Sequence, residues 1–126
     1  MKMLKGCAWY LLFMATLHTV VGLILDFDSL AAMLRDGVGT IDQPHEDRLA
    51  ALWFMFSGAL MFIVAGFTFW SVRVAGSLPT FLGPVFLLMG AVGGYIIPDS
   101  GLWLYIPIGL FLLIRNAPGK KTAVHA

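Results

Sequence analysis

Charged residues are scarce in this chain of 126 amino acids, at 12% against the roughly 25% that is usual in soluble domains. Its single cysteine, Cys7, excludes an internal disulfide. The sequence contains no Gly-rich phosphate loop and no C-x-x-C, H-E-x-x-H or G-x-S-x-G motif. These absences exclude the motif-bearing nucleotide-binding, thiol-redox, zinc-protease and hydrolase classes, and nothing in the sequence points to a nucleic acid.

Apolar residues make up 60% of the chain and gather in long runs. A bilayer core about 30 Å thick requires roughly 20 apolar residues in a helix that rises about 1.5 Å per residue. Residues 6–25 and 49–72 meet this requirement. The turn around Asp99, in YIIPDSGLW, divides the remaining apolar region into 80–97 and 101–115. The sequence therefore predicts an all-α fold, an integral membrane four-helix bundle that forms a single domain over residues 1–126.

Residues 26–48 form the predicted outer loop between the first two apolar runs. Phe27, Leu30, Ala31 and Leu34 have the spacing of one helical face, and Gly37 follows them. We therefore expect a short amphipathic helix that lies on the outer membrane surface.

The distribution of lysine and arginine predicts the orientation in the membrane. Lys2, Lys5, Arg73 and the basic tail 116–126 fall on one side of the predicted bundle, while the loop 26–48 is mainly acidic. Because basic residues concentrate on the cytoplasmic side, we expect both termini to be cytoplasmic. Trp9, Tyr10 and Trp70 lie near helix ends, where aromatic residues favour the membrane interface.

His18 is the one basic side chain inside the first apolar run, which contains no carboxylate. It lies eight residues before Asp26, which places it roughly 12 Å below the outer boundary. At a similar depth the other runs carry small residues and hydrogen-bonding groups, and Trp53 is the aromatic residue considered for the inside of the bundle. The candidate ligand-binding residues are His18, Trp53, Ser57, Gly58, Gly90 and Tyr105.

Two interpretations of His18 are open at this stage, and the first is that it only packs. Its ring nitrogens would then bond to Ser57, Thr19 or Thr16, or to a carbonyl near Pro107. Polar side chains do form such contacts between membrane helices, at about 1 kcal/mol each.

In the second interpretation, which we favour, Gly58 and Gly90 leave a cavity for a hydrophobic ligand such as a quinone or a lipid. His18 would be the polar anchor, since an ionisable residue inside a membrane span often marks a functional site. A haem has less support, because His45 and His125 lie outside the apolar runs and leave no second ligand inside the membrane.

The charged residues above this level form a predicted outer mouth of the bundle, namely Asp26, Glu46, Asp47 and Arg48. Glu46 and Asp47 suit the first turn of a helix, where the macrodipole favours negative charge. We expect Arg48 to pair with Asp26 or Asp28. No spacing of acids and histidines matches a zinc or calcium site, so we predict no metal centre.

The motif LHTVVG (17–22), followed by DRLAALWFMFSG (47–58), resembles small, mostly uncharacterised bacterial membrane proteins of four helices. The layout is similar to that of the DoxX-like group, some of whose members accompany quinone-linked redox enzymes. The resemblance implies the bacterial inner membrane as location and implies no particular activity.

Three functions follow from these observations. The favoured one is a membrane protein that binds a hydrophobic ligand near His18. The second is an accessory subunit that docks another membrane protein, or a second copy of itself, through the glycines of the third apolar run. The third is an enzyme acting on a lipid-like substrate, with His18 as general acid–base.

Overall fold

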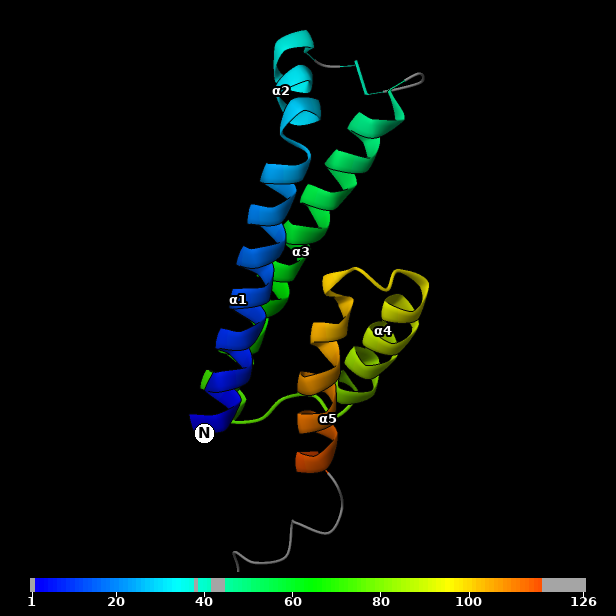
Figure 1. The fold of residues 1–126 in the computed structure, drawn as a ribbon. Coiled ribbons are helices and arrows are strands. Elements are labelled where there is room, and N and C mark those ends of the chain that lie inside the picture. The colour runs from blue at the N-terminus through cyan, green and yellow to red at the C-terminus, as the bar shows by residue number, and fades with distance from the viewer. Residues whose placement is uncertain (1, 38, 42–44, 117–126) are drawn as a thin grey trace, which may run out of the picture. The chain divides into compact units, whose positions relative to one another are not determined.

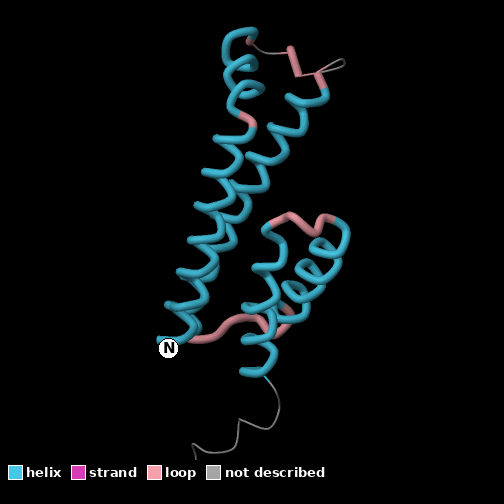
Figure 2. The backbone as a smooth tube through the Cα atoms, viewed as in Figure 1, coloured by secondary structure: helices cyan, strands magenta, loops and turns pink. Residues whose placement is uncertain are grey.

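The computed structural model describes residues 2–37, 39–41 and 45–116, and within these ranges every regular element is a helix (Figures 1 and 2). The predicted all-α fold is confirmed. The chain divides into two compact units, residues 1–74 and 75–126, and the single domain expected from the sequence stays a prediction. The first unit contains α1 (Lys2–Leu25), α2 (Phe27–Asp36) and α3 (Glu46–Ala75), and the second contains α4 (Leu82–Ile96), the 3₁₀ helix η1 (Gly101–Leu104) and α5 (Tyr105–Asn116).

In the first unit α1 and α3 run antiparallel and pack along their lengths (Figure 1). At one end Gly22 faces the ring of Phe54. Toward the other end, the ring of Trp9 meets that of Phe69 edge-on, with centroids 5.2 Å apart. Small side chains allow the two helices to approach each other, because they bring little volume to the contact. The alanines with no exposed surface are Ala8, Ala15, Ala51 and Ala65.

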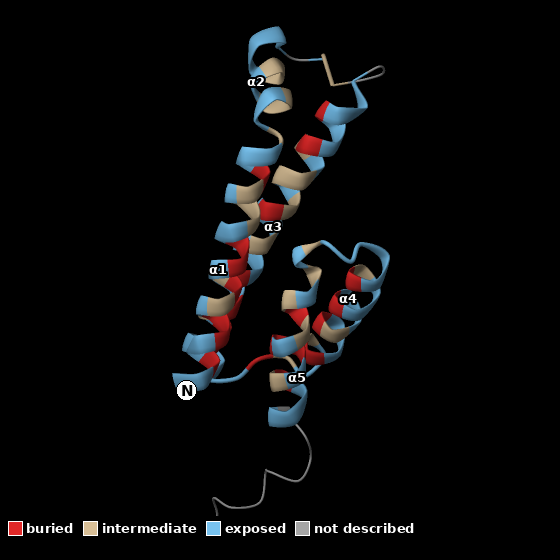
Figure 3. Cartoon of the chain, viewed as in Figure 1, coloured by how far each residue is buried: buried red, intermediate tan, exposed pale blue. Residues whose placement is uncertain are grey.

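The outward faces of α1 and α3 remain apolar and exposed (Figure 3). Phe13, Ile24 and Ile63, for example, are 59%, 70% and 65% exposed. The helices contain 24 and 30 residues, or about 36 and about 45 Å. Both are long enough and apolar enough to cross a membrane.

Two of the four predicted membrane helices thus reach a spanning length within the described residues. The third predicted run becomes α4, which has only 15 residues, and the fourth is divided between η1 and α5. Pro79 and Pro98 flank α4 and limit its length, since proline disfavours helical continuation. The expectation of a four-helix membrane bundle therefore has structural support for α1 and α3.

The amphipathic helix expected in the outer loop is present as α2. It follows α1 after the turn at Asp26 and ends before Gly37, whose φ of 86° favours glycine. None of its residues is buried, and the apolar side chains of Phe27 and Leu34 are 65% and 88% exposed. Its placement on a membrane surface stays a prediction.

The second unit is a helical hairpin, in which glycines bring α4 and α5 into backbone contact (Figure 1). A Cβ at Gly109 would lie 2.8 Å from the backbone nitrogen of Leu87 and 3.0 Å from the carbonyl oxygen of Gly83. The connection between the helices is held by Trp103, whose Nε1 donates to the carbonyl oxygen of Pro98 at 2.8 Å.

Candidate functional site

His18 projects from α1 into its contact with α3. Its Nε2 lies 2.9 Å from Oγ of Ser57 and 3.0 Å from the carbonyl oxygen of Phe54. The Ser57 hydroxyl itself donates to that carbonyl oxygen, at 2.7 Å. Ser57 is one of the alternative partners that the packing interpretation offered, and the second partner is the carbonyl oxygen of Phe54, which was not among them.

These three distances assign the tautomer of the neutral His18 ring. Because the Ser57 proton is directed to the carbonyl oxygen of Phe54, Oγ is left with lone pairs that accept a hydrogen bond. A carbonyl oxygen also only accepts, so Nε2 must carry the proton to bond to either partner. Nδ1 is then the acceptor nitrogen of the ring.

Nδ1 of His18 has no hydrogen-bond partner within the described residues. In that part of the chain, the single buried side-chain polar atom without a partner is Oγ1 of Thr19. Nδ1 is therefore not enclosed, which agrees with the half-buried state of the His18 ring. The site presents one basic nitrogen, held in a fixed orientation, that can accept a hydrogen bond or a proton.

Gly58 does not create the cavity that the sequence suggested. A Cβ at Gly58 would lie 2.7 Å from Oγ1 of Thr19 and 3.3 Å from Cδ2 of His18, so these side chains already fill the space. At Gly90, a Cβ would lie 2.7 Å from Cγ1 of Ile106 in the second unit. The glycines serve close helix packing, as small residues commonly do in membrane proteins.

The remaining candidate residues have other surroundings. Trp53 is 65% exposed on α3, and its ring tilts against that of Phe56, with centroids 6.0 Å apart. Tyr105 is buried in the second unit, where its ring stacks on Phe86 at 5.5 Å. Of the six candidates, His18, Ser57 and Gly58 are brought together by the structure.

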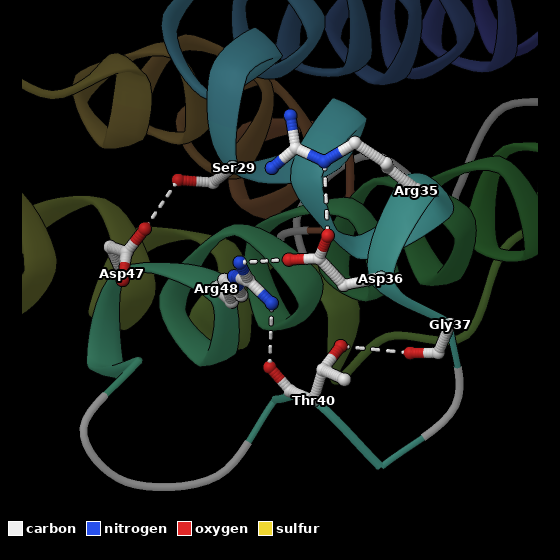
Figure 4. A network of polar contacts seen from close by, with 7 residues as sticks. All are labelled: Ser29, Arg35, Asp36, Gly37, Thr40, Asp47 and Arg48. Carbon is white, nitrogen blue, oxygen red and sulfur yellow. Dashed lines mark hydrogen bonds and ion pairs between the residues drawn. The ribbon is translucent and has the colours of Figure 1, made fainter.

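A second polar cluster joins α2 to the start of α3 (Figure 4). Arg48, only 7% exposed, donates from Nη2 to Oδ2 of Asp36 at 2.7 Å and from Nη1 to the carbonyl oxygen of Thr40 at 3.0 Å. Ser29 donates to Oδ2 of Asp47 at 2.8 Å. These bonds hold α2 and the backbone at Thr40 against the first turn of α3.

The expectation that Arg48 pairs with Asp26 or Asp28 is wrong. Ser29 and Asp36 are seven residues apart, which is about two helical turns, so they share the face of α2 that meets α3. Asp28 lies off this face, and Asp26 precedes the helix.

The acidic residues Glu46 and Asp47 do occupy the first turn of α3, as predicted. Hydrogen bonds from Arg35 and then from Arg48 hold the pKa of the Asp36 carboxyl below its ordinary value of 3.8. Asp36 is therefore ionised at neutral pH and accepts from both arginines, Arg35 through Nε at 3.0 Å. The cluster has the form of a structural brace.

Among the described residues, no group of three or more histidine, cysteine or acidic side chains is placed to hold a metal.

Phe54 and Asp36 were not predicted as site residues from the sequence, each for an identifiable reason. Phe54 contributes a ring face and a backbone oxygen, and neither is marked by its residue type. Asp36 was detectable by its seven-residue spacing from Ser29, but only once the register of α2 against α3 was known.

Comparison with known proteins gives one result. Residues 2–119 match a family model described as "Family of unknown function (DUF6463)". Because the match covers most of the chain, the chain belongs to this family, which fits the expected uncharacterised family. The DoxX-like layout and the bacterial origin stay predictions. No curated protein and no solved structure matches the chain.

Proposed function

We propose that this member of the family is a membrane-embedded binding protein, in which His18 receives the hydroxyl group of a lipid-soluble ligand. One observation carries the proposal: Nε2 is fixed as a donor to α3, while Nδ1 has no partner within the described residues. A bare acceptor nitrogen in a low-dielectric environment gains considerably from a donor, since an unmade bond there is costly.

The membrane placement is supported by the exposed apolar faces of α1 and α3. A helix in the core of a soluble protein buries such faces, but less than a third of the most apolar stretch of either helix is buried in the structure. Lipid tails would cover them without any further protein contact. His18 then lies inside the bilayer, about 10 Å along α1 from its end at Leu25.

The assigned tautomer narrows the chemistry of the ligand. Nδ1 accepts, so it pairs with a hydroxyl such as that of a quinol, a diacylglycerol or another lipid alcohol. The carbonyl oxygens of an oxidised quinone also accept, and they would bind only to the protonated ring. The proposal therefore refines the expected quinone or lipid to a hydroxyl-bearing form.

The test is thermal unfolding of the detergent-purified chain with added quinol, oxidised quinone or diacylglycerol. A ligand that binds the folded state alone raises the stability by mass action, by about 2.7 kcal/mol at a hundred times its Kd. We expect hydroxyl-bearing compounds to raise Tm in the wild type and not in His18→Leu. Ser57→Ala is the matched control, because it keeps Nδ1 and should keep most of the shift.

Equal shifts in the wild type and in His18→Leu would show that ligands bind elsewhere. Equal shifts from quinol and oxidised quinone would overturn the assigned hydrogen-bond direction. Mass spectrometry of molecules that copurify with the wild type, but not with His18→Leu, would identify the natural ligand.

An accessory-subunit function rests on a different surface. Exposed aromatic residues are enriched in interfaces, and Trp53 and Phe56 form such a pair on α3. The glycines of α4 support this function less, because side chains and backbone of η1 and α5 already cover Gly83, Gly90 and Gly94. Copurification of one partner in stoichiometric amount, lost in Trp53→Ala, would favour it.

A further inference from the structure

The ends of α1 and α3 that lie away from α2 enclose a half-open groove of about 540 Å³. Its lining combines two cations with aromatic and aliphatic side chains: Lys5, Phe69, Trp70, Val72 and Arg73. This volume falls within the range of about 300–1,000 Å³ that is usual for small-molecule sites. None of these residues belongs to the His18 site.

The two cations of the groove come from different helices, Lys5 from α1 and Arg73 from α3. Neither Lys5 nor Arg73 forms an ion pair with a carboxylate of the first unit within its described residues. The described carboxylates of that unit begin at Asp26, which along α1 is about 31 Å from Lys5. Two like charges that converge on one groove repel each other, so an anion placed between them would be stabilised by both.

We propose that this groove binds the phosphate of an anionic phospholipid headgroup. Arg73 can form two parallel hydrogen bonds with phosphate oxygens, and Lys5 adds a point charge from the opposite helix. Basic pockets between membrane helices on the cytoplasmic side are known to take such headgroups. The inference rests on the membrane placement proposed above, and is independent of any ligand at His18.

The apolar part of the groove suits a lipid better than a soluble phosphate. Trp70 is 57% exposed, as expected for a tryptophan at a membrane interface. Phe69 is held by the edge-on contact with Trp9 at 5.2 Å and forms a fixed wall. Acyl chains below the phosphate would continue along the exposed apolar faces of α1 and α3.

The test uses the full chain in nanodiscs of phosphatidylcholine with or without one fifth phosphatidylglycerol, followed by native mass spectrometry of retained lipid. We expect preferential retention of phosphatidylglycerol, reduced roughly fivefold for each cation removed in Lys5→Gln and Arg73→Gln. Lys2→Gln is the matched control, since it removes a charge from the same helix end outside the groove lining, and it should retain the preference.

Each outcome bears on the inference. Equal retention of phosphatidylglycerol by the wild type and by the Lys5→Gln, Arg73→Gln double variant would overturn the site. Membrane insertion is measured separately by carbonate extraction, and that result would leave it unaffected. A thermal shift produced by inorganic phosphate as large as that of phosphatidylglycerol would instead assign the groove to a soluble anion. Failure of the wild type to insert into membranes would reject the membrane placement itself.

Discussion

The imidazole of His18 lies nearly parallel to the ring of Phe54, with centroids 3.9 Å apart and planes inclined by 11°. The same phenylalanine offers its carbonyl oxygen to Nε2 at 3.0 Å. One residue of α3 therefore holds the histidine by its face and by its edge. This double contact explains how a polar ring is kept in an apolar helix pair without a surrounding cavity.

Ser57→Ala should lower the stability by only about 1 kcal/mol, the usual value of a polar contact between membrane helices. The cost is small because the carbonyl oxygen of Phe54 still accepts from Nε2. Thermal unfolding in detergent measures the change, and ¹⁵N chemical shifts of the imidazole report the tautomer. If the shifts of the wild type show the proton on Nδ1 instead of Nε2, the assigned hydrogen bonds are wrong.

Gly58→Ala should destabilise the first unit by about 1–3 kcal/mol, the cost of overpacking. The new Cβ would lie 2.7 Å from Oγ1 of Thr19, so that side chain must move. The cost should fall in a Thr19→Ala background, which a double-mutant cycle measures. Gly66→Ala on the same helix is the control, because its Cβ would meet no atom within 4 Å. Equal costs at both glycines would reject this account.

Much of the architecture follows from the sequence because it depends on patterns along one helix. The long apolar runs predict α1 and α3, and the spacing from Phe27 to Leu34 with Gly37 after it predicts α2. The contact of His18 with Ser57 was among the expected ones, because depth in an antiparallel pair restricts the partners.

The remaining features depend on rotation and register between helices, which composition does not determine. Gly58 was expected to leave space, but the rotation of α1 directs Thr19 into it. Arg48 had several acids within reach of its long side chain, and only the register of α2 against α3 selects Asp36. A residue count gives depth along a helix and says nothing about which face meets the neighbour.

Acidification should release the brace between α2 and α3. The pKa of Asp36 is lowered by hydrogen bonds from Arg35 and Arg48, so its stabilising contribution is complete above the ordinary value of 3.8. That contribution is lost as the pH falls below 3.8, through the folded-state pKa. Asp36→Asn lacks this anion at every pH. The exchange rate of the α2 amides in the wild type should therefore approach that of Asp36→Asn, measured at the same pH, as the pH falls below 3.8.

At neutral pH Asp36 and its exposed partner Arg35 provide a matched pair of variants. Asp36→Asn should open α2, because it leaves the nearly buried Arg48 without its anion. Arg35→Gln should have little effect, since the Arg35 side chain is 75% exposed. Unchanged exchange of α2 in Asp36→Asn would show that the brace does not hold the segment.

Gly109→Ala should disrupt the second unit, because its Cβ would lie 2.8 Å from the backbone nitrogen of Leu87, which cannot rotate away. We expect a loss of about 1–3 kcal/mol, typical of overpacking. Gly101→Ala is the control, since the new Cβ would lie 3.9 Å from Cδ1 of Leu104, an ordinary contact distance. Thermal unfolding followed by circular dichroism measures both variants, and equal stability of the two would contradict the close approach of α4 and α5.

The orientation of the first unit in a membrane can be tested with single cysteines in a Cys7→Ala background. Lys5 and Arg73 line one end of the unit, and Asp36 and Asp47 lie at the other, so the positive-inside rule places Thr40 outside and Ser77 in the cytoplasm. A membrane-impermeant thiol reagent should label Thr40→Cys in intact cells and Ser77→Cys only after permeabilisation.

Residues 117–126 of the predicted cytoplasmic tail lie outside the described part of the chain, and Thr122→Cys should behave as Ser77→Cys does. Labelling of both ends in intact cells would exclude a spanning pair, and the reverse pattern would invert the orientation. In either case the phosphate groove could not face the anionic cytoplasmic leaflet, which makes this measurement the prerequisite for the lipid-binding test.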